Sequence, residues 1–172
     1  QLFLPKVTGG VDEKNQALIN SNLKNKILSL AGPDSRASLH GDFEVVFNNG
    51  KLLVIQFVGV TFIKGMAHPN KIDQGIHIDL ATGKIYSLAD LFLPGIDYAA
   101  KILDITGRSK PDSRLAIEGL WDGWTHEDFV NSWSGVDQAY LLQLASLRVY
   151  SIPRYATGSI SGYQIRYADL ID

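Results

Sequence analysis

The stretch "DFEVVFNNGKLLVIQFVGVTFI", residues 42–63, decides the fold. Its first part, residues 42–47, mostly alternates apolar and polar side chains, as a strand with one buried face requires. Asn49-Gly50 signals a tight type I′ turn, because both central residues of that turn need positive φ. Residues 51–63 are nearly all apolar, which predicts a central strand covered on both faces. The stretch therefore predicts a β-hairpin.

The flanking sequence predicts helices and further strands. Residues 12–30 carry apolar side chains at helical spacing behind a possible N-cap, Asp12. Residues 76–80 alternate apolar residues with His77 and Asp79, which predicts a half-buried strand with its polar face exposed. The remaining predictions are a short helix after Ser87, a helix over 97–106, mostly helical structure over 115–146, and closing strands in "LRVYSI" and "YQIRYADL". The sum is an α+β fold, with helices packed on a mostly antiparallel sheet.

The bulk composition indicates one globular domain. The chain has 172 residues, 45% apolar and 20% charged, so we expect one compact domain over 1–172, with possible sub-halves 1–64 and 65–172. A net charge of −2 gives no electrostatic footprint for nucleic acid. There is no cysteine, which excludes disulfides, thiol nucleophiles and cysteine-ligated zinc.

Membrane association is expected only through a missing segment. No run of 18 apolar residues exists, so we expect nothing in these residues to span a membrane. The chain begins at Gln1, and we expect a leader, anchor or further domain to precede it.

The sequence offers no recognisable catalytic or metal-binding constellation. No two of the four histidines have i,i+4 spacing, and the HExxH, GxSxG and phosphate-loop patterns are missing. His77 and Asp79 share a strand face and could bind a metal with a third ligand, but an exposed polar face explains them more simply. The acidic residues Asp122, Glu127 and Asp128 are best explained as solvating or capping a helix. We therefore expect a protein that is not an enzyme, with no metal and no cofactor.

The segment "KGMAHPN", residues 64–70, joins two predicted strands and contains a histidine. Gly65 lets the backbone turn, and Pro69 restricts His68 to an extended conformation. We expect the imidazole to hydrogen-bond the loop backbone and hold the strand crossing in shape.

The segment "LWDGWTHEDFVNSW" contains all three tryptophans, Trp121, Trp124 and Trp133. Flat aromatic faces can stack on sugar rings or anchor a protein partner. The alternative is that the indoles pack a satellite core between helices.

Several stretches together resemble the extracytoplasmic domain of lysozyme-sensing anti-sigma factors of the RsiV type. The same domain precedes the catalytic domain of some peptidoglycan deacetylases and is largely of unknown function. The similar stretches, in the family's order, are "LPKVTGGVDEKNQALIN", "GMAHPN", "IDLATGKIYSLADLF", "IPRYATG" and "YQIRYADL". The sequence departs from the family pattern at Met66 and at Arg154, which separates Pro153 from Tyr155.

The resemblance implies a non-catalytic binding or sensing module outside the cytoplasm, secreted or on the surface of a Gram-positive-type bacterium. Its partner would be a wall hydrolase such as lysozyme, or a peptidoglycan component. The candidate binding residues of such a module are Met66, His68, Pro153 and Tyr155, with Trp121 and Trp124 added from the tryptophan-containing segment. Two alternatives stay open: a cell-envelope hydrolase or metal-dependent enzyme using His68 or His77, and a structural spacer within a larger surface protein.

Overall fold

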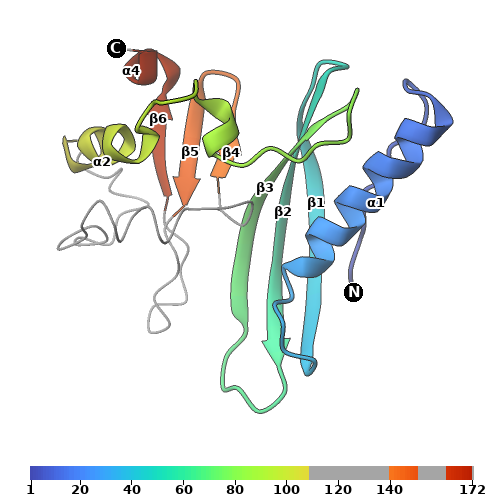
Figure 1. Ribbon diagram of the computed structural model, residues 1–172. Helices are drawn as coiled ribbons and strands as arrows, with labels where there is room; N and C mark the ends of the chain where they lie inside the picture. The colour runs from blue at the N-terminus through green and yellow to red at the C-terminus, as the bar shows by residue number, and fades with distance from the viewer. Residues whose placement is uncertain (109–139, 151–161, 172) are drawn as a thin grey trace.

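Two three-stranded antiparallel sheets stand side by side, with β4 of one next to β3 of the other (Figure 1). The structure is a computed structural model, and it describes residues 1–108, 140–150 and 162–171. In chain order the elements are α1 (Glu13–Ser29), β1 (Ala37–Asn48), β2 (Leu52–Ile63), β3 (Asn70–Asp79), the 3₁₀ turn η1 (Ala89–Leu91), α2 (Tyr98–Arg108), β4 (Tyr140–Leu142), β5 (Ser146–Tyr150), β6 (Gly162–Arg166) and α4 (Tyr167–Ile171). The strand orders are β1-β2-β3 and β4-β5-β6. The α+β class is confirmed, with the strands divided between two small sheets.

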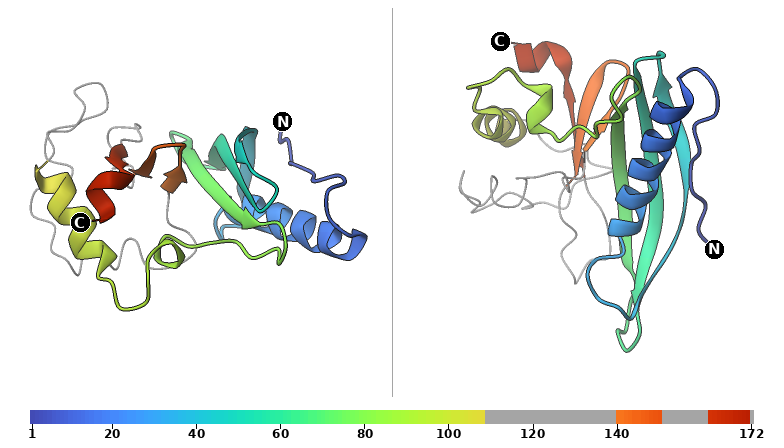
Figure 2. Two further views of the ribbon diagram at one scale, coloured as in Figure 1. Left: turned by 90° about the horizontal axis from the view of Figure 1, so that it is seen from above. Right: turned by 45° about the vertical axis from the view of Figure 1, so that its right-hand side comes forward.

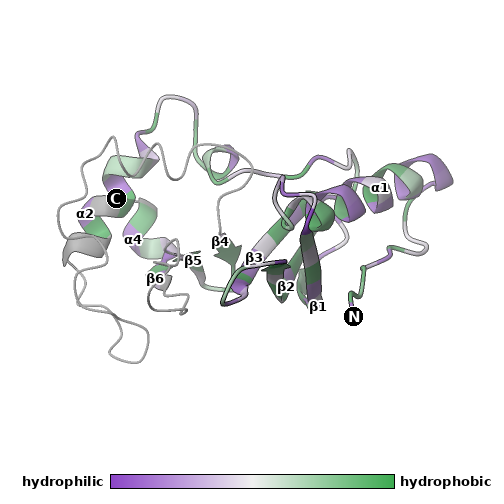
Figure 3. Ribbon diagram, turned by 90° about the horizontal axis from the view of Figure 1, so that it is seen from below, coloured by the Kyte–Doolittle hydropathy of each residue, from purple (hydrophilic) through white to green (hydrophobic). Residues whose placement is uncertain are grey.

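Helix α1 forms where the sequence predicted it and covers one face of the first sheet (Figures 1 and 2). The Asp12 carboxylate accepts the Asn15 N–H at 3.0 Å, which caps the first turn. Ile19, Leu23 and Ile27 are fully buried in a core shared with β2 and β3. Green and purple residues alternate around α1 in Figure 3, as expected of a helix with one apolar side.

The β1–β2 hairpin is confirmed, but its turn is wider than the type I′ turn that Asn49-Gly50 predicted. Gly50 has φ 79°, whereas no residue other than glycine has positive φ in the described chain, so Asn49 does not fit that turn. The Asn49 carboxamide oxygen instead accepts the N–H groups of Lys51 and Leu52, at 3.0 and 2.8 Å. These side-chain hydrogen bonds stabilise the wider turn, which does not require positive φ at Asn49.

A β-bulge interrupts the alternation of β1. The pairing with β2 shifts register between Val45 and Phe47, so Val46 is an extra residue. Val46 and Phe47 pack against the buried cluster of Val54, on the face away from α1, while 56% of Val45 is exposed. The bulge therefore divides the hairpin's apolar side chains between the two faces of the sheet.

Strand β2 is central, as predicted, but is covered on both faces along only part of its length. Its first half is buried by α1 on one side and by the second sheet on the other. Further along, on the face opposite α1, Val58 and Phe62 are 53% and 43% exposed. The prediction of two covered faces is wrong for this half, because the short second sheet reaches only the end of β2 where Val54 lies.

The two sheets meet where the β4 backbone approaches Gly75 in β3. A Cβ atom on Gly75 would lie 1.9 Å from the Tyr140 carbonyl oxygen, so any larger residue would push β4 away. Leu141 and Tyr150 of the second sheet pack with Val54 next to this crossing. The absence of one side chain thus lets the two sheets share a core.

A second core fills the space between the second sheet and its helices. Its buried members are Leu88, Ala99, Ile102, Tyr140, Leu147, Val149 and Ile165. Two predictions are wrong here. Residues 140–142, expected in a mostly helical region, form β4, and the predicted closing strand "YQIRYADL" ends at Arg166 and continues as α4. Tyr167 donates its hydroxyl to the Gln143 carbonyl at 2.7 Å, and Leu170 packs against this core, so tertiary contacts favour the helix.

We predict that Gly75→Ala destabilises the protein by roughly 2 kcal/mol or more, because the new methyl group overlaps the Tyr140 carbonyl. Urea denaturation followed by circular dichroism measures this. The matched control is Lys71→Ala, at an exposed position of the same strand, which should change the unfolding free energy by no more than about 0.5 kcal/mol. Equal stability of both variants would show that the sheets do not depend on this contact.

Candidate functional site

The predicted binding residues fall into two groups. Met66 and His68 lie in the β2–β3 loop, which the structure describes. Four predicted binding residues lie outside the described residues: Trp121, Trp124, Pro153 and Tyr155. Trp133 and the acidic residues Asp122, Glu127 and Asp128 also lie outside them.

His68 is exposed at the tip of the β2–β3 loop. Within the described part of the chain its imidazole makes no hydrogen bond, so the expected architectural role is wrong. The turn closes instead through the Met66 N–H, which donates to the Ile63 carbonyl at 3.0 Å. Met66 is itself 36% exposed. Both side chains are therefore accessible to a partner.

His77 is fully buried, contrary to the predicted exposed polar face. Its Nε2 atom accepts the Leu142 N–H at 3.0 Å, and its ring stacks on Tyr140 at 4.1 Å and 7°. Nε2 can accept only in the neutral tautomer with the proton on Nδ1, and burial lowers the pKa of His77 to about 3. His77 therefore connects the two sheets and is not accessible as a metal ligand or a base.

Asp79, the other half of the possible metal pair, is occupied by the loop that follows it. Its Oδ1 accepts the N–H groups of Ala81 and Thr82, each at 2.8 Å, and its Oδ2 accepts the Tyr86 hydroxyl at 2.8 Å. These bonds hold the pKa of Asp79 below its usual value. Among the described residues, no group of three metal-ligating side chains occurs.

The first sheet has an uncovered surface opposite α1, and we call it the open face. It is made of side chains from all three strands, because residues paired across strands share a face. It consists of Ser38, His40, Asp42 and Glu44 from β1, Val58, Val60 and Phe62 from β2, and Lys71 and Asp73 from β3. The central strand contributes a row of apolar side chains, and polar residues lie on both sides of it. Asp42 and Asp73, for example, both pair with Val58.

The open face is hollowed where two glycines pair. Gly41 lies opposite Gly59, and a Cβ atom on either would come within 3.0 Å of the Phe57 ring, which fills that space on the α1 side. On the opposite side there is a hollow of about 650 Å³, lined in part by Val58 and Lys71. The backbone of both glycines lines this accessible depression in the middle of the sheet.

Asp73 links the open face to the sheet junction. Its carboxylate accepts the Gln56 side-chain amide at 2.7 Å. Burial raises the pKa of the neighbouring Tyr150, and the Asp73 charge adds to this rise. Among the described residues, the Tyr150 hydroxyl has no hydrogen-bond partner. Three carboxylates, from Asp42, Glu44 and Asp73, accompany one ammonium group, from Lys71, so this face is acidic on balance.

Comparison with known proteins gives likeness in fold. No protein-family model and no curated protein matches the chain. A member of the DUF3298 family from Bacteroides fragilis aligns with a TM-score of 0.50 at 16% identity, over 92% of this chain and 63% of that one. A DUF3298 family protein from Pseudomonas aeruginosa PAO1 aligns with a TM-score of 0.45 at 19% identity, over 86% of this chain and 66% of that one.

The structural neighbours are thus DUF3298 family proteins, and DUF3298 is a domain of unknown function. At 16% identity the Bacteroides fragilis structure supports a shared fold and no shared activity. This chain spans less than two thirds of the length of either neighbour. In the described residues, no helix is both long and apolar enough to cross a membrane.

We predict that His77 makes folding stability fall as pH falls from about 6.5. The unfolded state takes up a proton on this imidazole near pH 6.5, whereas the folded state resists protonation down to about pH 3. The unfolding free energy should therefore decrease by about 1.4 kcal/mol per pH unit below pH 6 from this group alone. Urea denaturation at pH 7.5, 6 and 5 measures the slope.

The matched variant for this experiment is His77→Gln, which has no titratable group at the position. It should be less stable at pH 7.5, because the contacts with Leu142 and Tyr140 change, but its stability should depend less steeply on pH. An identical pH slope in both proteins would contradict the assignment of His77 as the buried neutral group.

Proposed function

We propose that this chain is a non-catalytic, extracytoplasmic binding module that recognises a protein partner through the open face. The observation that carries the proposal is the exposed apolar row of β2, with Val58 53% and Phe62 43% exposed in the middle of a sheet. Central strands normally bury such side chains, and apolar surface rimmed by polar residues marks interaction sites. The likeness of several stretches to lysozyme-sensing domains supports the same class of function.

The β2–β3 loop extends this surface beyond the end of the strands. Met66 and His68 follow Phe62 within six residues along the chain, and both are exposed. A flexible, polarisable methionine at the end of an apolar row suits an adaptable protein contact. We therefore include both residues in the proposed binding surface.

The charges of the open face favour a basic partner. Asp42, Glu44 and Asp73 outnumber Lys71, so a partner with a positive rim is attracted and one with a negative rim is repelled. Aliphatic side chains dominate its centre, and Phe62 is its only aromatic residue among those described. This composition favours a protein, for which we propose a wall hydrolase of the lysozyme type, over stacking on the sugar rings of peptidoglycan.

The surroundings of His68 and His77 support a binding module more than an enzyme. Among the described residues, His77 is sealed inside the junction and His68 has no hydrogen-bonded partner to activate it. The proposed activity is therefore binding of a partner. Apolar contacts of the open face would supply the affinity, and the charged residues on both sides of the apolar row would supply the specificity.

Isothermal titration calorimetry with hen-type lysozyme, and separately with soluble peptidoglycan fragments, tests the proposal. We predict saturable binding of lysozyme that weakens with added salt, because opposite charges meet at the interface. The double variant Val58→Thr/Phe62→Ala should lose affinity about tenfold or more, since two central apolar contacts are removed.

The matched control is the double variant Leu93→Ala/Leu144→Ala, which truncates leucines that are 77% and 89% exposed outside the open face. It should bind as the unaltered protein does. Binding of peptidoglycan fragments alone would replace the protein partner with a wall glycan. Absence of binding to both probes would contradict the proposed function and favour the structural spacer.

A further inference from the structure

The N-terminal arm, residues 1–11, begins as an extra strand and then leaves the sheet. At its start, the Phe3 N–H donates to the Gly41 carbonyl and the Gly41 N–H donates to the Gln1 carbonyl, each at 3.1 Å. These bonds add the arm to the free edge of β1 in parallel orientation. Beyond Phe3 the described chain shows no further backbone bond between the arm and β1.

Side chains of α1 hold the arm away from β1. Asn20 accepts the Val7 N–H at 2.7 Å and donates to the Val7 carbonyl at 3.0 Å, and Gln16 donates to the same carbonyl at 2.8 Å. The two carboxamides thus occupy the backbone groups that Val7 would otherwise offer to a neighbouring strand. The arm is fixed to the helix at the point where β1 lacks a partner.

The edge of β1 therefore presents unpaired backbone groups next to the arm. Because the N–H and C=O of Gly41 point outward to the arm, those of Phe43 and Val45 point the same way, two and four residues further on. The Phe43 N–H donates to the Asp42 carboxylate at 2.8 Å. By the same alternation the Val45 N–H and carbonyl point away from β2, and among the described residues no backbone hydrogen bond outside the strand ladders involves them.

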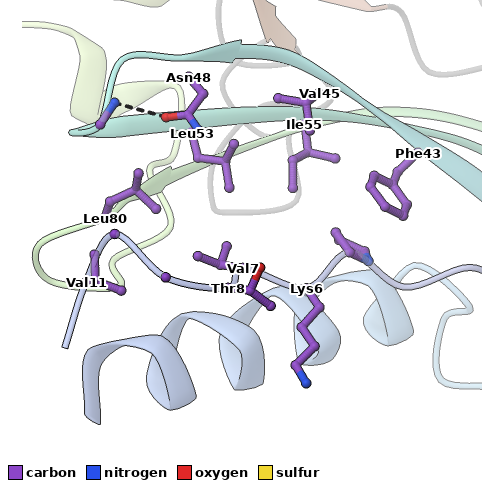
Figure 4. A pocket seen from close by; sticks show the side chains of 14 residues that line it. Lys6, Val7, Thr8, Val11, Phe43, Val45, Asn48, Leu53, Ile55 and Leu80 are labelled. Carbon is purple, nitrogen blue, oxygen red and sulfur yellow. Dashed lines mark hydrogen bonds between the residues drawn. The ribbon is translucent and has the colours of Figure 1, made fainter. Parts of the chain in front are cut away.

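A slot of about 420 Å³ separates this edge from the arm. We call it the arm slot. Figure 4 shows it between the strands of the sheet and the arm, with Val7 and Val11 on the arm side and Val45, Leu53 and Ile55 on the sheet side, and with the Lys6 ammonium pointing away. Most of the side chains that line it are apolar, and Phe43 and Val45 of the edge strand β1 are among them, as in grooves that bind an extended peptide beside a sheet edge.

The existing contacts at the edge of β1 indicate which kind of occupant fits the arm slot. Residues 1–3 already pair with this edge, so the slot continues an existing strand addition. In a second copy the same edge of β1 is already paired at Gly41 with residues 1–3 of its own arm. A single extended segment that is not already part of a sheet carries no such arm.

We propose that the arm slot binds an extended peptide segment of a partner protein by β-strand addition to Phe43 and Val45 of β1. The peptide's alternate apolar side chains fill the space between Val7, Leu53 and Ile55, and its backbone pairs with the free edge. The slot opens on the α1 side of the sheet, so this site is independent of the open face.

The test uses a capped seven-residue peptide in which valines alternate with threonines between terminal lysines. Two further versions carry N-methyl groups on all valines or on all threonines, which blocks one or the other backbone edge. In the unaltered protein we expect saturable NMR shift changes at the Phe43 and Val45 amides. One of the two methylated peptides should not bind, because its methyl groups block the N–H groups that face β1. If that peptide turned over to use its other edge, its valines would point away from the slot.

Two variants at one position provide the matched comparison. Val45→Pro removes the outward N–H, which the β1–β2 ladder does not use, and should weaken binding at least about tenfold. Val45→Thr keeps the N–H and the branched shape, so it should bind more tightly than Val45→Pro does. Phe62→Ala on the open face should bind normally, which separates this site from the proposed function.

Several results would overturn the proposal. Equal affinity of all three peptides would show that no backbone pairing occurs, and equal binding by Val45→Pro and Val45→Thr would exclude this edge. Shift changes that grow with protein concentration without peptide, together with a doubled mass in sedimentation, would identify a second copy as the occupant. The comparison of the three peptides uses the unaltered protein, so it still tests the proposal if a variant fails to fold.

Discussion

The close approach of β4 to Gly75 is the constraint on which the rest of the structure depends. Only a residue without a Cβ leaves room for the Tyr140 carbonyl at that distance. The approach then lets Leu142 donate to His77 and brings the Tyr140 ring onto the imidazole. Tyr140 in turn donates its hydroxyl to the Tyr86 carbonyl at 2.7 Å, which fastens the chain beyond β3 to the same point. The two three-stranded sheets thereby share one buried junction.

The junction also determines which surfaces stay accessible. Because the second sheet is short, it covers the first sheet only around Val54 and leaves the apolar row that continues through Val58 and Phe62 exposed. On the opposite face α1 buries the sheet but draws the arm to itself through Asn20. One sheet therefore carries two separate binding candidates. The open face suits a folded, basic protein surface, and the arm slot suits an extended chain.

The likeness to the Bacteroides fragilis DUF3298 structure supports the arrangement of helices and strands, and only the chemistry of the surfaces bears on the partner. Two predicted binding segments lie outside the described residues: the Trp-rich segment, which its aromatic side chains suggested, and the turn at residues 153–155, which the family resemblance implicates. The open face and the arm slot rest on the described residues alone.

The sequence by itself determined the local elements of this protein. Asp12 and the spacing of Ile19, Leu23 and Ile27 predicted α1, and the apolar run after Asn49-Gly50 predicted the hairpin, because capping and periodicity act over a few residues. Only the tertiary structure decided which of these side chains are covered. The same alternation of apolar and polar residues places His77 in the buried junction and leaves Asp42 in solvent. A run of valines has the same sequence pattern whether or not another sheet covers it. Burial depends on residues far apart in the chain, such as Gly75 and Tyr140, whose meeting no local pattern encodes.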